Sequence, residues 1–456
     1  MSTADTPVHD SIDEAPTRGF HLRMTAFVGG GQFVDGYIQG VIAIALVMLP
    51  ATWDLTPFWK GALGSSALIG TFFGSIMFGW ISDHIGRKTL YTVDLSIFLA
   101  GSIAQFFVAN VWQLFIIRLI VGLAIGIDYA VGPSYLAEFT PRRSRGRLLG
   151  SLCGMWTIGY SASLLVGVIG SHWSGDAWRW VLASSAIPAI VVLVLRIGSP
   201  ESPRWLVRKG RLAEAEAICK KYIGGEVSVD DLLAEANVRP SYRKLLSGMW
   251  RRRAIFVSVW WSALAWPEFA IFTFLPTILI TLHIHNGNLA SLIIRLLSLP
   301  TFALGMLLMG RRMGRRRMLI WSMVALTAIF LVLGLFSAPS GWLVVTFFGL
   351  FALVLGFVSN LEFLYPAELF PTDIRASGVG LGSAGSRIGA ALGTWLLPVL
   401  LAGPGLQTAM LLTFGVLAAA TVVAVLWAPE TNGVTLYEAS TGQPASTLTA
   451  AAETAS

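Results

Sequence analysis

Four acidic residues lie deep within long apolar segments of this chain: Asp35, Asp128, Glu268 and Glu362. An ionised side chain at the centre of a membrane-spanning helix costs at least about 2.5–3.5 kcal/mol, so such a residue is by default a candidate for function. Exposure of all four acids to lipid would be expensive, which favours a hydrated cavity. A carboxylate removed from water also tends to take up a proton, so these acids are candidates for proton binding.

A cation and several aromatic residues share these apolar segments. Arg387 could bind a substrate carboxylate through two parallel hydrogen bonds, or Glu362 or Glu268 could neutralise it. Pro267 interrupts backbone hydrogen bonding beside Glu268 and could open a polar site there. The aromatic residues could line a cavity or simply pack between helices. The candidates for substrate binding are Gln32, Gln39, Trp156, Tyr160, Trp261, Glu268, Asn360, Glu362, Arg387 and Trp395.

Apolar runs of membrane length must position these residues. A helix needs about 20 apolar residues to cross a bilayer, and continuous runs of that length argue against a transmembrane barrel, whose strands would alternate. Twelve such runs are present. They lie near residues 24–48, 59–81, 90–109, 112–136, 147–170, 178–198, 253–282, 288–309, 317–336, 342–366, 377–401 and 405–428.

The composition also indicates a membrane protein. Of the 456 residues, 55% are hydrophobic and 12% are charged, and the mean hydropathy is +0.70. Soluble domains carry roughly 25% charged residues. The net charge of +7 comes from basic residues in short loops, which is a topology signal and does not indicate nucleic-acid binding. With a cytoplasmic N-terminus, 26 of the 32 Lys and Arg residues fall on the cytoplasmic side, so we expect cytoplasmic termini and a cytoplasmic central loop.

One charged motif occurs twice, about 230 residues apart. Residues 137–146 and 367–376 keep Glu, Pro and Arg at the same spacing, and each copy follows a long apolar run. A repeat of half the chain indicates two copies of one helical plan. In an apolar chain, two such halves are typical of a membrane transporter with a site between them. We therefore predict an all-α membrane protein with twelve transmembrane helices in two pseudo-symmetric six-helix bundles.

Several loop segments resemble motifs of the major facilitator superfamily. Residues 79–88 resemble its cytoplasmic signature loop, and residues 313–316 resemble a degenerate second copy. Residues 200–206 and 429–433 resemble the sequences that end the two halves of sugar porters. Together with the repeated motif, the resemblance covers about residues 24–435.

This resemblance implies a cytoplasmic gate of salt bridges, which form in the outward-open state and separate as the two halves rock. It also implies that the four acids line a central cavity. The alternative for the gate residues is that they are solvated loop charges. The implied gate residues are Asp83, Arg87, Glu138, Arg145, Glu201, Arg204, Glu368, Arg375 and Glu430.

The buried charges resemble those of three transporter groups. Asp35 and Asp128 resemble acids of phosphate:proton symporters, Arg118 resembles the sugar-porter arginine that partners an acid of the first helix, and Arg387 resembles an arginine of organic-ion transporters. The resemblance implies a proton-coupling site of Asp35, Arg118 and Asp128. Movement of Arg118 relative to Asp35 would change the affinity for protons; a permanent structural ion pair is the alternative. The Gln-rich signature of sugar porters is absent from the seventh run, which weakens the case for a hexose.

The runs divide the chain into five parts. We predict a disordered N-terminal tail at residues 1–23, a six-helix bundle at 24–198, a cytoplasmic linker with amphipathic helices at 199–250, a second six-helix bundle at 251–430 and a disordered tail at 431–456. Within the linker, Leu206 to Tyr222 reads as an amphipathic helix. Residues 1–20 have no basic start and no apolar core, so we expect no cleavable signal peptide.

The sequence therefore predicts a secondary active transporter. We expect proton-coupled symport of a small polar organic metabolite, an organic acid or a sugar-like compound, by alternating access. The alternatives are proton-coupled efflux of organic cations or drugs, and a non-transporting nutrient receptor. The expected partners are a small-molecule substrate, protons and the lipid bilayer of a cell membrane. We expect the protein to be a monomer. We expect no enzyme activity, nucleic-acid partner, cofactor, metal, disulfide framework or ATP-binding loop.

Overall fold

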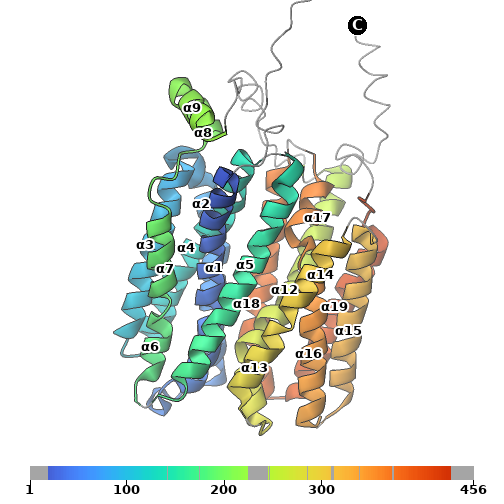
Figure 1. Cartoon of the computed structure of the whole chain (residues 1–456). Helices are drawn as coiled ribbons and strands as arrows, with labels where there is room; N and C mark the ends of the chain where they lie inside the picture. The colour runs from blue at the N-terminus through green and yellow to red at the C-terminus, as the bar shows by residue number, and fades with distance from the viewer. Residues whose placement is uncertain are drawn as a thin grey trace, which may run out of the picture.

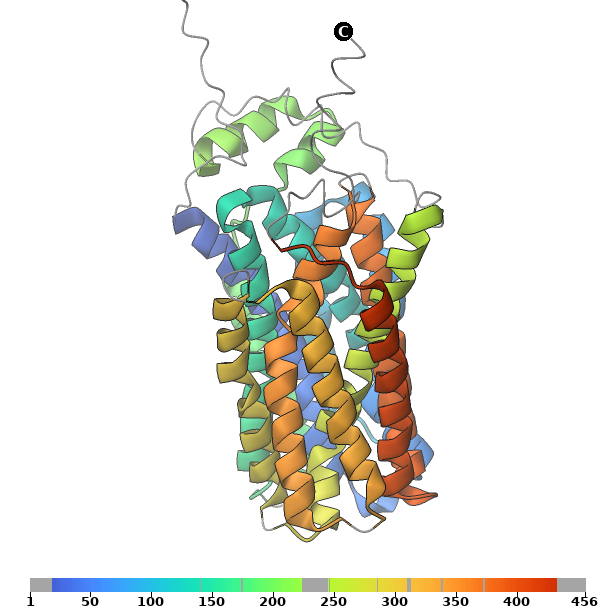
Figure 2. The same cartoon turned by 90° about the vertical axis from the view of Figure 1, so that its right-hand side faces the viewer.

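The computed structural model describes residues 19–140, 142–173, 175–223, 245, 247–284, 286–309, 313–337, 339–371 and 374–432. Within these residues, nearly all regular structure is helical. The long helices run alongside one another in a single bundle, with short helices beyond one end (Figures 1 and 2). We call that end the linker face and the opposite end the far face.

The N-terminal half and the linker contain eleven helical elements among the described residues. The half consists of α1 (Gly19–Met48), η1 (Ala51–Trp53), α2 (Pro57–Ile85), α3 (Arg87–Phe106), α4 (Val111–Phe139), α5 (Arg142–Gly170), α6 (Ala177–Ala183) and α7 (Ala186–Leu195). The linker contributes α8 (Pro203–Arg208) and α9 (Leu212–Ile218), followed by a π-helical turn at Cys219–Ile223.

The C-terminal half lies beside the N-terminal half (Figure 1). Its described helices are α12 (Gly248–Thr281), α13 (Gly287–Leu296), α14 (Ser298–Leu308), α15 (Arg315–Leu335), α16 (Gly341–Val358), α17 (Leu361–Leu369), α18 (Arg375–Ala402) and α19 (Leu406–Trp427).

Twelve helical segments are long and apolar enough to cross a membrane. Their outer surfaces are apolar as well: the side chains of Trp342 and Phe107 are 76% and 72% exposed. Lipid can cover such surfaces, whereas water would leave a large apolar area hydrated. The prediction of an all-α membrane protein with twelve spans is confirmed.

Three of the predicted runs are each split into two helices. The breaks between α6 and α7 and between α13 and α14 each precede a proline, Pro188 and Pro300. Because proline has no N–H, the carbonyl four residues earlier loses its helical partner. The third break separates α16 from α17 at Ser359, whose hydroxyl donates to the Leu355 carbonyl at 2.9 Å. Such bonding back to the preceding turn bends helices.

By contrast, α12 continues through Pro267 and Pro276. Pro267 thus removes a backbone hydrogen bond without ending the helix of the seventh span. Neighbouring helices in a membrane bundle can compensate for a missing backbone hydrogen bond.

The two halves press together at the far face. A Cβ added at Gly61 of α2 would meet the Trp395 carbonyl oxygen of α18 at 2.3 Å. Next to this contact, the rings of Phe58 and Trp395 meet edge to face, with their centroids 5.7 Å apart. Toward the linker face, a Cβ at Gly380 of α18 would meet nothing within 4 Å. The backbones of the two halves therefore come into close contact at the far face.

Some predicted boundaries need correction. The predicted helix from Leu206 to Tyr222 is wrong: α8 and α9 are separate, and Gly210 between them has φ +75°. The first helix begins at Gly19, inside the predicted tail, and Thr431 is ordered by contacts described below. Residues 1–18, 224–244 and 433–456 lie outside the described residues.

Candidate functional site

A cavity lies between the two halves, with an empty volume of about 480 Å³. Both halves contribute to its wall, which combines aromatic rings, three charged side chains and small polar groups. The lining residues are Gln32, Tyr129, Cys153, Trp156, Thr157, Trp261, Ala265, Glu268, Phe269, Ser359, Glu362, Ser386 and Arg387.

Arg387 of α18 lies at the junction of the two halves. Its guanidinium carbon is 4.2 Å from the centre of the Tyr129 ring, in the N-terminal half, and 5.6 Å from that of Phe269. Its Nε and Nη1 atoms are buried and have no hydrogen-bond partner among the described residues. A buried donor without an acceptor costs about 1–3 kcal/mol, and more when it is charged. The site therefore holds a cation that an anionic ligand could satisfy.

Glu268 and Arg295 form a second charged feature of this region. Arg295 Nη2 lies 3.4 Å from Glu268 Oε1. The guanidinium carbon of Arg295 is also 4.9 Å from the centre of the Tyr160 ring and 4.3 Å from that of Phe272. Arg295 is thus enclosed by rings from both halves, which favours a cation over their faces. Glu268 lines the cavity with its charge matched by Arg295.

A cluster of buried charges lies within the N-terminal half. Asp35 of α1, Asp94 of α3 and Asp128 of α4 are each 0% exposed. Arg196, directly after α7, donates through Nη1 to Asp94 Oδ1 at 3.4 Å and to the Tyr91 carbonyl at 2.7 Å. Three helices and the end of a fourth therefore bring three carboxyl groups around one guanidinium. We call Asp35, Asp94, Asp128 and Arg196 the acid cluster.

Gln32 connects the cavity to the acid cluster. It lines the cavity, and its Nε2 donates to Asp35 Oδ2 at 3.4 Å. Tyr129, which lines the cavity beneath Arg387, is the sequence neighbour of Asp128. A change of ligand in the cavity can therefore reach the carboxyl groups through one side chain.

The remaining candidates lie outside the cavity wall. Tyr160 faces Arg295, and Asn360 donates to the Phe302 carbonyl at 3.0 Å. Trp395 packs at the far face, and Gln39 is buried with no hydrogen-bond partner for its amide among the described residues. These four side chains therefore do not line the cavity that the structure forms.

Arg118 does not pair with Asp35 in this structure. It donates to the Ile38 carbonyl at 3.4 Å and to Gln105 Oε1 at 3.5 Å. Among the described residues, the arginine that belongs to the acid cluster is Arg196. The predicted pairing is therefore replaced by a different one, because α7 folds back against α3 and places Arg196 beside Asp94.

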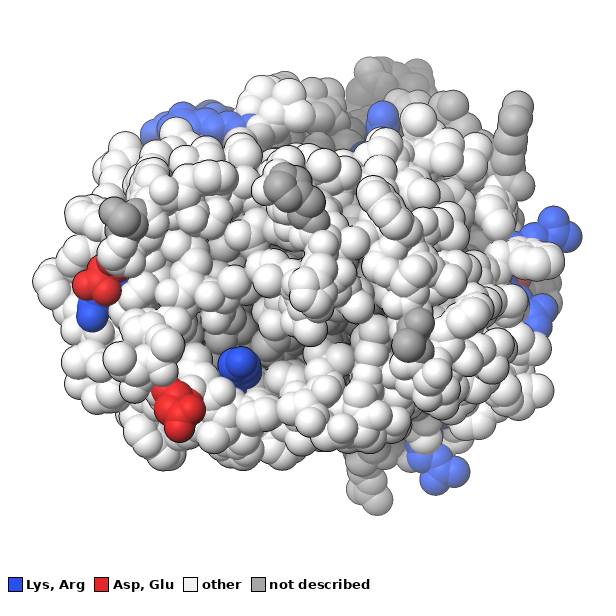
Figure 3. Space-filling view, turned by 90° about the horizontal axis from the view of Figure 1, so that it is seen from below, with Lys and Arg blue, Asp and Glu red and all other residues white. Residues whose placement is uncertain are grey.

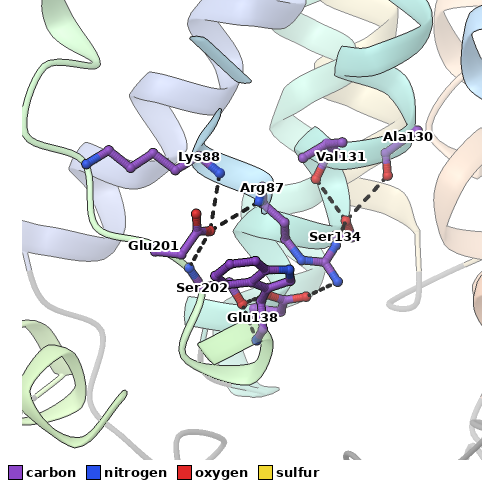
Figure 4. A network of polar contacts seen from close by, with 9 residues as sticks. Arg87, Lys88, Ala130, Val131, Ser134, Glu138, Glu201 and Ser202 are labelled. Carbon is purple, nitrogen blue, oxygen red and sulfur yellow. Dashed lines mark hydrogen bonds and ion pairs between the residues drawn. The ribbon is translucent and has the colours of Figure 1, made fainter. Parts of the chain in front are cut away.

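At the linker face, the N-terminal half closes a network of polar contacts (Figure 4). Arg87 Nη2 lies 2.9 Å from Glu138 Oε1, and Ser202 also donates to Glu138. Glu201 accepts from the backbone N–H groups of Arg87 and Lys88, both at 3.2 Å. The carboxylate of Glu201 thus lies at the N-terminus of α3, where the helix dipole favours negative charge.

The C-terminal half repeats this network. Arg315 Nη2 lies 3.1 Å from Glu368 Oε1, and Thr431 donates to Glu368. Glu430 accepts from the Arg315 backbone N–H at 3.0 Å, at the N-terminus of α15. Corresponding tyrosines of the two halves, Tyr135 and Tyr365, donate to the carbonyls of Pro200 and Pro429.

These contacts show how the predicted gate residues are paired. The ion pairs between described residues each join groups of one half. Arg375 donates from Nε to the Phe370 carbonyl at 3.2 Å. The side chains of Asp83 and Arg145 lie outside the described residues. The role of this set as a gate stays a prediction.

Comparison with known proteins identifies the family. The family model described as sugar (and other) transporter matches residues 24–442. The chain belongs to this family. The inner membrane metabolite transport protein YgcS of Escherichia coli is 42% identical over 94% of this chain and 96% of its own length. The niacin transporter NiaP of Acinetobacter baylyi is 29% identical over 93% of this chain and 98% of its own length.

Solved structures agree on the fold. The xylose transporter XylE of E. coli, in a partially occluded inward-open conformation, aligns with a TM-score of 0.78 at 20% identity, covering 92% of this chain and 100% of that chain. This alignment confirms the predicted arrangement of two helical halves, and the family match confirms the predicted transporter superfamily. The chain is a multi-pass membrane transporter for sugars or other metabolites.

Several residues of the site are not among the candidates predicted from the sequence. Asp94 is an acid within an apolar run, and that signal was available. Arg196 was also visible as a cation in an apolar run, but only packing reveals that it meets Asp94. Tyr129 and Phe269 were not predicted because an aromatic side chain can belong to a cavity wall or to a helix interface.

Proposed function

We propose that this transporter carries a small organic acid together with protons, by alternating access. The observation that carries the proposal is the position of Gln32, which lines the cavity and also donates to Asp35. A cavity for substrate and buried acids for protons are the two sites that symport requires. Gln32 supplies the connection between them.

The free guanidinium of Arg387 supports a carboxylate-bearing substrate. It is 5% exposed, lines the cavity and has two donor atoms without described partners. A carboxylate can accept two parallel hydrogen bonds from an arginine. The faces of Trp156 and Trp261 add apolar surface suited to a ring. The name of the relative NiaP, a niacin transporter, agrees with this substrate class.

A sugar-like or polyol substrate is the second candidate. Gln32, Thr157, Ser359 and Ser386 line the same cavity and could hydrogen-bond to hydroxyl groups. A solved structure of XylE describes a proton:xylose symporter, with a TM-score of 0.75 at 22% identity, over 92% of this chain and 98% of that chain. This alternative leaves the two unpartnered donor atoms of Arg387 without a carboxylate from the substrate, which is why we rank it second.

The proposed orientation places the linker face in the cytoplasm. Basic residues concentrate in loops on that side, as the positive-inside rule requires. The far face carries few charged side chains (Figure 3). Protons and substrate would enter from the far face, and both would leave toward the cytoplasm.

The cycle follows from these parts. With the far face open, water reaches the acid cluster, which takes up protons while a carboxylate binds Arg387. Protonation removes the negative charges of the acids. The neutral acids can then be buried between packed helices as the halves close, since burial penalises the ionised form. Opening at the linker face rehydrates the acids, which release their protons as the substrate departs.

Purified protein in liposomes tests this function. A thermal-shift screen with nicotinate, xylose, myo-inositol and an aliphatic amine selects the ligand class, and we expect nicotinate or another ring carboxylate to give the largest stabilisation. We expect acidification outside the liposomes to drive uptake of that compound. Stabilisation by the sugars or the amine alone would overturn the choice of substrate.

Arg387→Ala tests the role of the guanidinium. Loss of a hydrogen bond to a charged group costs about 1.5–3 kcal/mol, so we expect carboxylate affinity to fall about 10- to 100-fold. Arg387→Lys keeps the charge but not the planar fork. Its carboxylate affinity should lie between those of the unaltered protein and Arg387→Ala. Unchanged carboxylate affinity in Arg387→Ala would remove this residue from the site.

A further inference from the structure

The acid cluster contains more negative than positive charge. Asp35, Asp94 and Asp128 are fully buried, and Arg196 is 6% exposed. With every group ionised, three negative charges would face one positive charge away from water. Each buried ion already costs several kcal/mol to desolvate, and its partner must repay that cost. One guanidinium can compensate one carboxylate, which leaves two negative charges to be neutralised.

The contacts indicate which carboxylate Arg196 compensates. Its Nη1 donates to Asp94 Oδ1 and its Nε donates to the Phe27 carbonyl at 3.4 Å. Its guanidinium carbon lies 3.8 Å from the centre of the Tyr91 ring. Asp94 Oδ1 also accepts from the Leu95 backbone N–H. Both hydrogen bonds favour the ionised form of Asp94. Asp94 and Arg196 therefore form the ion pair of the cluster.

Asp128 lies beside this ion pair without a hydrogen bond of its own. A Cβ added at Gly31 would meet Arg196 Nη2 at 2.2 Å and Asp128 Oδ2 at 2.4 Å, and one at Gly132 would meet Tyr91 Oη at 2.3 Å and Asp128 Oδ1 at 2.8 Å. Both carboxyl oxygens of Asp128, Arg196 Nη2 and Tyr91 Oη are buried with no hydrogen-bond partner among the described residues. Asp128 is thus surrounded by polar groups, and its carboxyl group has no cation of its own because Arg196 is paired with Asp94.

Asp35 is placed similarly. Its Oδ2 accepts the hydrogen bond from Gln32, and its Oδ1 is buried without a described partner. A neutral amide supplies no positive charge. Among the described residues, no group of acids is arranged to hold a metal ion, and Arg196 would repel a bare cation. Protons are therefore the ligands that suit this site.

We propose that the closed acid cluster binds two protons, one on Asp35 and one on Asp128, while Asp94 and Arg196 stay ionised as a pair. Each proton comes from water at the open face and converts a carboxylate into a carboxylic acid. Each returns to water when the opposite face opens. Only the delivery of these protons during transport rests on the proposed function; the number bound does not.

Infrared difference spectroscopy on the purified protein counts these protons without a substrate. A protonated carboxyl group has a C=O stretching band separate from those of carboxylates and of asparagine. Electroneutrality predicts two such bands from the cluster of the unaltered protein. Asp35→Asn and Asp128→Asn should each remove one band. Asp94→Asn should also leave one protonated-carboxyl band, because Arg196 can then pair with Asp35 or Asp128 and keep that acid ionised.

Arg196 provides the opposite test. Arg196→Gln removes the only cation of the cluster and should raise the number of protonated carboxyl groups to three, whereas Arg196→Lys should keep two. Asp176→Asn, on an exposed loop, is the control and should change no band. The proposal is overturned if Asp35→Asn and Asp128→Asn leave the protonated-carboxyl region unchanged, or if Arg196→Gln adds no band to the count in Arg196→Lys.

Discussion

At the scale of single residues, Gln32 lies between the cavity and Asp35. Its amide can donate to Asp35 or to a ligand in the cavity, and the 3.4 Å bond to Asp35 is long enough to be exchanged. In the function that we propose, a side chain in this position makes the state of one site depend on the other. Allosteric coupling of this kind is a free energy shared by both sites.

Gln32→Ala should therefore weaken coupling more than binding. We expect proton-driven accumulation to lose a larger share of its activity than substrate counterflow, which needs no net proton movement. The matched control is Gln39→Ala, two helical turns away on α1 and outside the cavity wall. Equal losses of accumulation and counterflow in Gln32→Ala would show that Gln32 acts only as a binding residue.

Cys219 gives a prediction for the linker. Burial, with a smaller contribution from the Glu216 carboxylate, raises the pKa of its thiol to about 11. An ordinary thiol has a pKa of about 8.5, and the thiolate is the reactive form. The alkylation rate of Cys219 should therefore rise about tenfold per pH unit from pH 8 to pH 10.

Iodoacetamide labelling of a Cys153→Ser variant, followed by mass spectrometry, measures this rate. Circular dichroism at each pH verifies that the helices persist. A rate that levels off by about pH 9 would contradict the raised pKa.

Residue types revealed some of the site but not its pairings. Charges in apolar runs are costly, and this rule selected Glu268, Glu362 and Arg387, which the structure places along the cavity. The same rule could not choose between Arg118 and Arg196 as the neighbour of the aspartates. That choice depends on how α7 packs against α3, which no spacing along the chain encodes.

At the scale of elements, two carboxylates act on helix N-termini. Glu201 accepts from backbone N–H groups at the start of α3, and Glu430 does so at the start of α15. The equivalent contacts in the two halves explain why the sequence repeats there. Each carboxylate satisfies donors that a helix cannot satisfy internally.

Glu201→Gln and Glu430→Gln should each destabilise the protein, by about 1 kcal/mol, because the charge at the helix terminus is lost. Unfolding midpoints in detergent measure the loss of stability in each variant, and the losses in the two variants should be similar. Glu216→Gln, on an exposed part of α9, is the control. A loss in only one half would show that the two networks are not equivalent.

Helix positions were easier to predict than helix interruptions. Continuous hydrophobicity marks a span whether or not it is broken, so the sixth, eighth and tenth spans each appeared as one run. Pro188 and Pro300 mark two of the breaks, but Pro267 and Pro276 lie within an unbroken α12. Proline removes one hydrogen bond at every site, and the surrounding helices decide whether the axis breaks.

At the scale of the whole molecule, the close packing at the far face defines the state of the transporter. Gly61 allows α2 to approach the backbone of α18 at Trp395. A side chain at position 61 cannot fit without separating the two halves there. In the proposed alternating-access cycle, this contact is broken and remade in each turnover.

Gly61→Leu should therefore favour a conformation that is open at the far face. We expect spin labels at exposed positions Asp176 and Ser340, one in each half, to move apart, and transport to fall. Gly415→Leu is the control, because a Cβ at Gly415 meets nothing within 4 Å. An unchanged distance between the labels would show that the packing at Gly61 does not hold the halves together.

Among the described residues, the ion pairs of the linker-face networks each join groups of one half. Arg87, Glu138 and Glu201 fasten one half, and Arg315, Glu368 and Glu430 fasten the other. A chain broken between α9 and α12 would cut none of these contacts. The two halves, made as separate polypeptides in one cell, should thus each fold and then assemble into a working carrier.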